Sequence, residues 1–113
     1  MGGIADYSGS LVLQLPIGRH TVAMLQPQSH PFLDVASLRA GSESRAGMTR
    51  DEFIASTPES LARRFPADSS DHWASYVFGV AHACLLRNAT RVRDSWQGFR
   101  IFIESNVPEG KGV

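Results

Sequence analysis

Hydrophobic residues form short, strand-like runs near both ends of the chain. In the middle they recur every three or four residues, as on one face of a helix. Residues 11–17 and 21–26 are apolar runs, and residues 18–20 between them are few enough to join adjacent strands. Residues 32–38 form a weaker third run, which is followed by a polar, glycine-containing loop at 41–44. We therefore predict that the first part of the chain forms three strands of an antiparallel sheet.

Two short helices are predicted to follow. Thr49 and Glu52 have the spacing of a capping box, in which the threonine accepts from a free backbone N–H and the glutamate reaches back. Thr57 followed by Pro58 indicates the start of a second helix. Proline lacks a backbone N–H, but in the first turn of a helix that N–H would have no partner within the helix.

The strongest periodic signal lies between residues 70 and 87. Apolar residues recur there at steps of three and four, which places them on one helix face: Trp73, Val77, Val80, Ala81, Cys84 and Leu85. Ser69 and Ser70 are candidate N-caps, and Asp71 favours the first turn. We predict a helix over residues 70–87, with Trp73 and Tyr76 as core aromatics and Cys84 buried in the packing.

A strand and a glycine loop come last. Phe99, Ile101 and Ile103 alternate with other residues, which predicts a strand over residues 99–105 with one apolar face. Residues 107–113 read Val-Pro-Glu-Gly-Lys-Gly-Val, and glycines two apart let backbone N–H groups turn toward one point, as in a phosphate site. The loop matches neither the Walker P-loop nor the dinucleotide fingerprint. Taken alone, it is better explained as a plain turn.

Composition narrows the possible classes of function. Eleven basic residues balance eleven acidic ones, so net charge favours neither nucleic acid nor a membrane surface as a partner. Neither a signal peptide nor an apolar run of about 20 residues is present, and we expect a soluble, cytoplasmic protein. The single cysteine excludes an internal disulfide and fits a reducing compartment.

Few side chains have a spacing that suggests chemistry. The four histidines, His20, His30, His72 and His82, lack the i, i+4 spacing of a metal-binding helix, and we expect surface or packing roles for them. Asp6 lies in a glycine-flanked loop before the first predicted strand. A carboxylate there can accept hydrogen bonds from two neighbouring sugar hydroxyls, although from spacing alone an Asp in an ordinary turn is the better explanation.

Read together, three motifs resemble the GHMP kinases, the family of galactokinase and the homoserine, mevalonate and phosphomevalonate kinases. Residues 6–13, Asp-Tyr-Ser-Gly-Ser-Leu-Val-Leu, resemble the sugar-binding signature of galactokinases. Residues 73–79, Trp-Ala-Ser-Tyr-Val-Phe-Gly, are similar to a helix that follows it, and residues 107–113 resemble the opening of the nucleotide loop. The order and rough spacing agree over nearly the whole chain. Residues 1–10 and 107–113 resemble the L-arabinokinase branch of the family.

The resemblance implies an α/β (α+β) fold, related to the second domain of ribosomal protein S5, in which helices pack on one face of a sheet. Residues 1–113 would be one partial N-terminal domain, truncated at both ends, with the sugar motif at 2–10 and the nucleotide loop starting at 107. The catalytic base is expected beyond Val113, so no catalytic residue is assigned here. We expect the 113 residues alone to be inactive.

The resemblance also implies an activity, namely the Mg²⁺-dependent transfer of the γ-phosphoryl of ATP to the anomeric hydroxyl of a monosaccharide. The implied sugar-binding residues are Gly3, Asp6, Tyr7 and Gly9, and the implied nucleotide-binding residues are Pro108, Glu109, Gly110, Lys111 and Gly112. Asp6 would hold ring hydroxyls of the sugar. Gly110 and Gly112 would let the backbone approach the phosphates, and Lys111 could add charge.

One departure from the galactokinase pattern bears on the sugar. Galactokinases carry Glu and His where this chain has Gly3 and Ile4. The resemblance implies that this Glu contacts the exocyclic 6-hydroxyl of galactose, a group that L-arabinose lacks, so its loss favours the pentose. The alternatives are a galactokinase, a uronic-acid kinase, or a non-catalytic relative that senses sugar and ATP. The expected partners are a monosaccharide and ATP, without nucleic acid or membrane, and the oligomeric state is open.

Overall fold

The computed structural model describes residues 18–39, 41–88 and 96–108. Within them the elements, in chain order, are β1 (Thr21–Gln28), β2 (Phe32–Arg39), β3 (Ser42–Thr49), α1 (Arg50–Ile54), α2 (Pro58–Arg64), α3 (Trp73–Arg87) and β4 (Gly98–Ser105). The predicted strands at 21–26, 32–38 and 99–105 are confirmed as β1, β2 and β4. The predicted strand at 11–17 lies outside the described residues.

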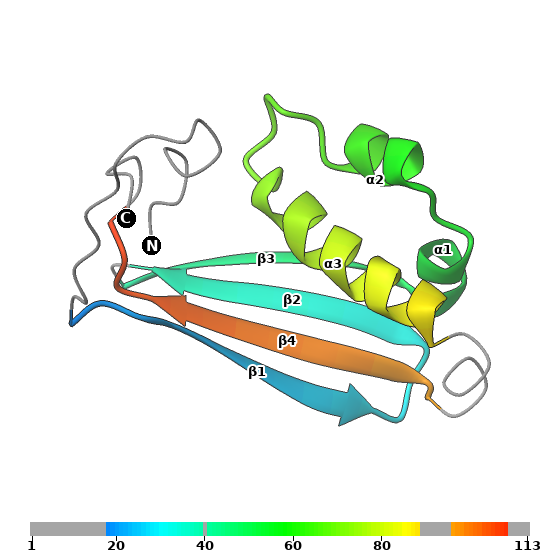
Figure 1. The fold of residues 1–113 in the computed structure, drawn as a ribbon, viewed down its shortest axis with the longest axis horizontal. Coiled ribbons are helices and arrows are strands. Elements are labelled where there is room, and N and C mark those ends of the chain that lie inside the picture. Colours follow the sequence, from blue (N-terminus) through cyan, green and yellow to red (C-terminus); the bar gives the residue numbers. More distant parts are fainter. Residues whose placement is uncertain (1–17, 40, 89–95, 109–113) are drawn as a thin grey trace, which may run out of the picture.

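The four strands form one mixed sheet in the order β1-β4-β2-β3 (Figure 1). β4 pairs with β1 in antiparallel orientation and with β2 in parallel orientation, and β2 and β3 are antiparallel. The expectation that consecutive strands pair as an antiparallel sheet is therefore wrong for β1 and β2, because β4 lies between them. An α/β fold with helices on one face of a sheet is confirmed.

The loop expected at residues 41–44 is instead a tight turn that leads directly into β3. Gly41 has a φ of 81°, in the left-handed region that glycine adopts without steric cost. Arg39 and Ser42 are already in register as the last pair of the β2–β3 ladder. The polar sequence that follows Gly41 therefore belongs to an edge strand.

Both predicted helix starts are confirmed. At α1, the Glu52 backbone N–H donates to Thr49 Oγ1 (3.2 Å) and the Thr49 N–H donates to Glu52 Oε2 (2.8 Å), which completes the capping box. The pKa of Glu52 is lowered by the Thr49 backbone N–H and, to a smaller extent, by the Thr49 hydroxyl, which lies 3.0 Å from the same carboxylate oxygen. At α2, Thr57 is the N-cap and Pro58 follows it in the first turn.

α3 ends at Arg87 as predicted but begins at Trp73, three residues later than expected. Its N-cap position is His72, which makes no side-chain capping bond, so neither Ser69 nor Ser70 caps it. The Ser69 hydroxyl instead donates to the carboxylate of Asp71. Among the helices of the described residues, none is long and apolar enough to cross a bilayer.

The core lies between the sheet and the three helices, which cover the same face (Figure 1). Leu33 and Val35 of β2 have no exposed surface, and Phe53 of α1 and Phe78 of α3 pack with them. Phe99, Ile101 and Ile103 of β4 pack against this cluster, so the predicted apolar face of that strand is confirmed.

The face of α3 that is most buried differs from the predicted stripe. Ala74, Phe78 and His82 are its buried residues, whereas Val77, Ala81 and Leu85 are only partly buried. Tyr76 is 69% exposed and Val80 is 67% exposed, and Cys84 is also exposed. The predictions of Tyr76 as a core aromatic and of Cys84 as a buried residue are therefore wrong. Trp73 does pack against the core, as expected.

Candidate functional site

The described residues contain only one member of the predicted sugar and nucleotide sites. Pro108 is described and exposed, three residues after the end of β4. The other predicted site residues lie outside the described residues: Gly3, Asp6, Tyr7, Gly9, Glu109, Gly110, Lys111 and Gly112. Their roles in sugar and nucleotide binding therefore stay predictions.

β4, which leads into the predicted phosphate loop, ends at an edge of the sheet where ligands commonly bind in α/β proteins. β2 and β4 are parallel, so their carboxyl ends meet at the same edge, where Arg39 is in register with Ser105. In open α/β sheets, ligands bind outside the carboxyl ends of parallel strands. The end of β4 is therefore the best candidate for a binding site among the described residues.

Hydrogen bonds between distant parts of the chain hold this end of the sheet in place. Arg39 Nη2 donates to the Val107 carbonyl across 3.1 Å, which ties the end of β2 to the start of the predicted loop. The His20 N–H donates to Asn106 Oδ1 (2.8 Å), and the Asn106 N–H donates to the His20 carbonyl (3.2 Å). Asn106, the residue after β4, is thus hydrogen-bonded to His20, the residue before β1.

Hydroxyl groups add a second set of contacts at the last pair of the β1–β4 ladder. Thr21 Oγ1 and Ser105 Oγ lie 2.8 Å apart, within hydrogen-bonding distance. Ser105 Oγ also accepts from the Val107 N–H across 3.3 Å. The backbone that enters the predicted loop is therefore anchored on both sides, toward β1 and toward β2.

A cavity of about 460 Å³ opens at this end of the sheet. Its lining combines charged and polar residues (Arg39, Glu104, Ser105 and Asn106) with apolar ones such as Leu38 and Pro108. Cavities of this size, with a few convergent polar groups, are typical of small-molecule sites. The cavity offers a guanidinium, a carboxylate, a hydroxyl and an amide, which can orient a polar ligand through hydrogen bonds.

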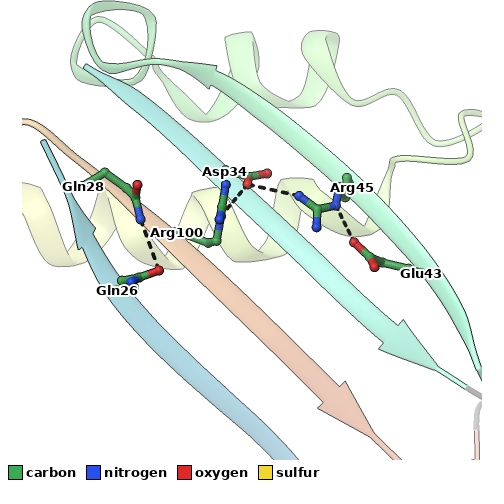
Figure 2. A network of polar contacts seen from close by, with 6 residues as sticks. All are labelled: Gln26, Gln28, Asp34, Glu43, Arg45 and Arg100. Atoms are coloured by element: carbon green, nitrogen blue, oxygen red, sulfur yellow. Dashed lines mark hydrogen bonds and ion pairs between the residues drawn. The ribbon is translucent and has the colours of Figure 1, made fainter. Parts of the chain in front are cut away.

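A second polar cluster lies on the face of the sheet that the helices leave uncovered (Figure 2). Arg100 Nε donates to Asp34 Oδ2 across 2.7 Å, and Arg45 Nη1 lies 3.6 Å from the same oxygen. Arg45 also pairs with Glu43, and this hydrogen bond, with the attraction between the charges, raises the pKa of Arg45. Because each charge of this ladder has a partner of opposite sign, we assign it a structural role rather than a catalytic one.

The histidines fill packing and surface roles, as expected. His82 is buried and its ring meets Phe53 edge-on at 5.5 Å between centroids, and His72 Nδ1 lies 2.8 Å from the Phe65 carbonyl. His20 and His30 are exposed. Across the described ranges, no three His, Cys, Asp or Glu residues form a group that could hold a metal ion.

Two residues of the candidate site, Arg39 and Asn106, were missed by the sequence analysis. Arg39 contacts a residue 68 positions away, and the backbone of His20, which Asn106 contacts, is 86 positions away. No local pattern indicates partners at such distances. The position of Asn106, directly between a strand and a glycine loop, was the one signal available.

Comparison with known proteins supports a relationship to sugar kinases. Over its whole length the chain is 34% identical, across 143 aligned residues, to one such kinase. That relative is the L-arabinokinase of Arabidopsis thaliana, and the chain spans 13% of its length. The aligned stretch is longer than the chain, so the relative has insertions within it. No family model matches the chain, and no solved structure matches it.

Proposed function

We propose that the chain is part of an ATP-dependent sugar-1-kinase of the GHMP superfamily. In this proposal the γ-phosphoryl of ATP passes to the anomeric hydroxyl of a monosaccharide, and L-arabinose is the preferred sugar. The observation that carries the proposal is the similarity to L-arabinokinase over the whole chain. The proposed fold is that of ribosomal protein S5 domain 2, of which the described mixed sheet would form a part.

The geometry of the sheet end is compatible with this proposal. β4 leads into the glycine loop at the edge where two parallel strands end, the usual place for a ligand in such sheets. Arg39 and Asn106 fix the backbone just before the loop. A phosphate loop works by positioning backbone N–H groups, so a well-anchored entry suits that task.

The proposed roles follow the motifs. Asp6 accepts hydrogen bonds from ring hydroxyls, within a sugar-binding set that also includes Gly3, Tyr7 and Gly9. The nucleotide phosphates lie against the backbone of Gly110 and Gly112, flanked by Pro108, Glu109 and Lys111. Mg²⁺ is a proposed cofactor of the whole protein, but the described residues offer no ligand set for it, and none of them is assigned to it.

The test is an assay of the full-length protein encoded by the reading frame that contains this chain. We expect formation of sugar 1-phosphate and ADP, with kcat/KM higher for L-arabinose than for D-galactose or D-galacturonate. Asp6→Asn should lower kcat/KM about tenfold to a hundredfold, because a hydrogen bond to a charged group contributes about 1.5–3 kcal/mol. Asp34→Asn, on the uncovered sheet face, is the matched control and should retain activity.

Three outcomes would change the assignment. A higher kcat/KM for galactose or galacturonate would support the kinase activity but change the assigned substrate. Binding of both ligands without phosphoryl transfer would identify a sensor. Absence of binding and of transfer would contradict the proposal altogether. The isolated 113-residue polypeptide is expected to release no ADP in the presence of sugar.

A further inference from the structure

Side chains hold both backbone polar groups of Val107, the second residue after β4. The Val107 N–H donates to Ser105 Oγ across 3.3 Å. The Val107 carbonyl accepts from Arg39 Nη2 across 3.1 Å. A residue whose donor and acceptor are both bonded has little freedom left in φ and ψ. The two bonds therefore fix the direction in which the chain continues after the sheet ends at Ser105.

Pro108 extends this constraint by one residue toward the predicted glycine loop. The proline ring fixes its own φ near −65° and favours an extended conformation of the residue before it. Pro108 has no N–H, so no backbone donor of its own can hold it in place. The direction in which the chain reaches Glu109 therefore depends on how Val107 is held.

The anchor joins the two parallel strands whose carboxyl ends form the candidate site. Arg39 is the last residue of β2 and is in register with Ser105, the last residue of β4 (Figure 1). The Arg39 side chain crosses from one strand end to the chain that leaves the other. Arg39, Ser105 and Val107 all line the cavity of about 460 Å³ at this edge.

Such an anchor matters most for a ligand that is bound by backbone N–H groups. Gly110 and Gly112 allow the predicted loop many conformations, and each conformation that does not fit a phosphate lowers the affinity. Fixing the entry of the loop removes part of that freedom before the ligand arrives. The proposed sugar-binding residues lie in another segment, residues 2–10, so the same anchor has less influence on the sugar.

We propose that Arg39 and Ser105 are positioning residues of the nucleotide loop. They act together through the backbone of Val107, and they set the affinity for the nucleotide without setting the affinity for the sugar. This inference rests on the proposed function, since the nucleotide is the ligand that the loop is proposed to bind. Neither side chain has to touch the nucleotide, because each acts on the backbone that leads to it.

The first test measures the Kd of Mg·ADP and the Kd of L-arabinose by calorimetry on the full-length protein. ADP takes the place of ATP so that no phosphoryl group is transferred. Arg39→Met removes a charged donor and should weaken ADP binding about tenfold, whereas Ser105→Ala removes a neutral acceptor and should weaken it about threefold. For both variants, the Kd of L-arabinose should change less than about twofold.

The double variant shows whether the two residues act through the same backbone. Independent contributions would multiply to a loss of about thirtyfold in ADP affinity. Action through Val107 should instead leave the double variant near the tenfold loss of Arg39→Met alone, because either change already loosens the loop entry. A guanidinium of Arg39 that bound the phosphates directly would give the independent result, which would refute the inference.

Hydrogen exchange of the protein without ligands gives a readout that does not depend on the nucleotide. Both single variants should speed exchange at residues 107–112 about threefold or more, because the loss of a hydrogen bond lowers the free energy of local opening. Arg45→Met and Ser44→Ala are the matched controls, since both residues lie on β3 and outside the cavity. They should leave the exchange rates and both Kd values unchanged.

Circular dichroism identifies a variant that fails to fold, and the other single variant then decides the result. ADP binding that is unchanged in the single variants, or an equal loss of affinity for ADP and L-arabinose, would refute the positioning role and leave the kinase assignment intact. A full-length protein that binds no Mg·ADP would refute the proposed function, and the nucleotide role of both residues with it.

Discussion

The two faces of the sheet are held by different physical means. On β2, Leu33 and Val35 point to the helices and have no exposed surface, while Asp34 between them points to the other face. There it joins Arg100 and Arg45, whose side chains are 44% and 57% exposed. Burial of apolar surface contributes about 25 cal/mol per Å², whereas an exposed ion pair contributes about 0–1 kcal/mol. Stability is therefore concentrated on one face. Phe78→Ala and Asp34→Asn test this contrast directly, and Gly98→Ala and Glu52→Gln compare it with backbone packing and helix capping.

The largest effect is expected from Phe78→Ala in the core. Phe78 is fully buried and stacks on Phe65 with 5.4 Å between ring centroids. Truncation should lower the free energy of unfolding by about 3–5 kcal/mol, since it creates a cavity as well as losing apolar contact. Urea unfolding followed by circular dichroism measures the loss. Leu86→Ala, at a position 63% exposed on the same helix, should change stability by less than about 0.5 kcal/mol. Similar losses for the two variants would contradict the contrast.

Gly98→Ala should have the second largest effect, and it acts through the backbone rather than through either face. A Cβ at Gly98 would lie 2.2 Å from the Phe32 carbonyl oxygen and 2.4 Å from that of His30. We expect a loss of about 2 kcal/mol, because the backbone must shift. Gly79→Ala is the control: nothing lies within 4 Å of its Cβ, and alanine favours the helix by about 1 kcal/mol. Stabilisation by Gly98→Ala would show that the start of β4 is not tightly packed.

Asp34→Asn tests the charged face and should have a smaller effect. The Asp34 carboxylate is the shared partner of Arg100 and Arg45, so its neutralisation weakens both contacts. We expect a loss of about 1 kcal/mol or less at low salt. The difference from the unmodified chain should shrink in 1 M NaCl, where the Debye length is about 3 Å. Urea titrations at the two salt concentrations measure it, and a loss that does not respond to salt would indicate a packing effect instead.

Glu52→Gln should have the smallest effect, visible as a pH dependence. The pKa of Glu52 is lowered in the folded state, first by the backbone N–H of Thr49 and then by its hydroxyl. A lowered folded pKa means that the ionised group stabilises the fold above the unfolded pKa, near 4.5, and that this contribution disappears as pH falls through the folded pKa. Unfolding midpoints of the variant and the unmodified chain should therefore differ at pH 7 and converge at acid pH. A difference that widens in acid would contradict the capping role.

Local signals in the sequence were sufficient for the starts of α1 and α2 but not for the whole sheet. The capping box of α1, the position of Pro58 at the start of α2 and the alternation in β4 involve residues a few positions apart, and each was predicted correctly. β3 was missed because only Ala46 and Met48 of that edge strand contribute to the core, too few for visible alternation. The order of the strands depends on pairings such as Leu33 with Phe99, which no local pattern encodes.

The face of α3 was misjudged for a related reason. Within the predicted stripe, Val77 and Ala81 are only partly buried and Val80 is 67% exposed. Phe78, outside the stripe, is the fully buried residue instead. Periodicity locates apolar surface without saying which partner covers it. For the candidate site, the sequence indicated the glycine loop, while the anchors Arg39 and Asn106 follow from contacts made only by the folded chain.

The central place of β4 has a consequence for biosynthesis. The β2–β3 hairpin can close as soon as it leaves the ribosome, but β1 has no neighbour other than β4 among the described strands. Until residue 105 has left the exit tunnel, the nascent chain therefore exposes β1 without its partner strand β4. Such intermediates are prone to aggregate and are natural clients of chaperones. The yield of properly formed protein should thus depend on how quickly translation completes β4.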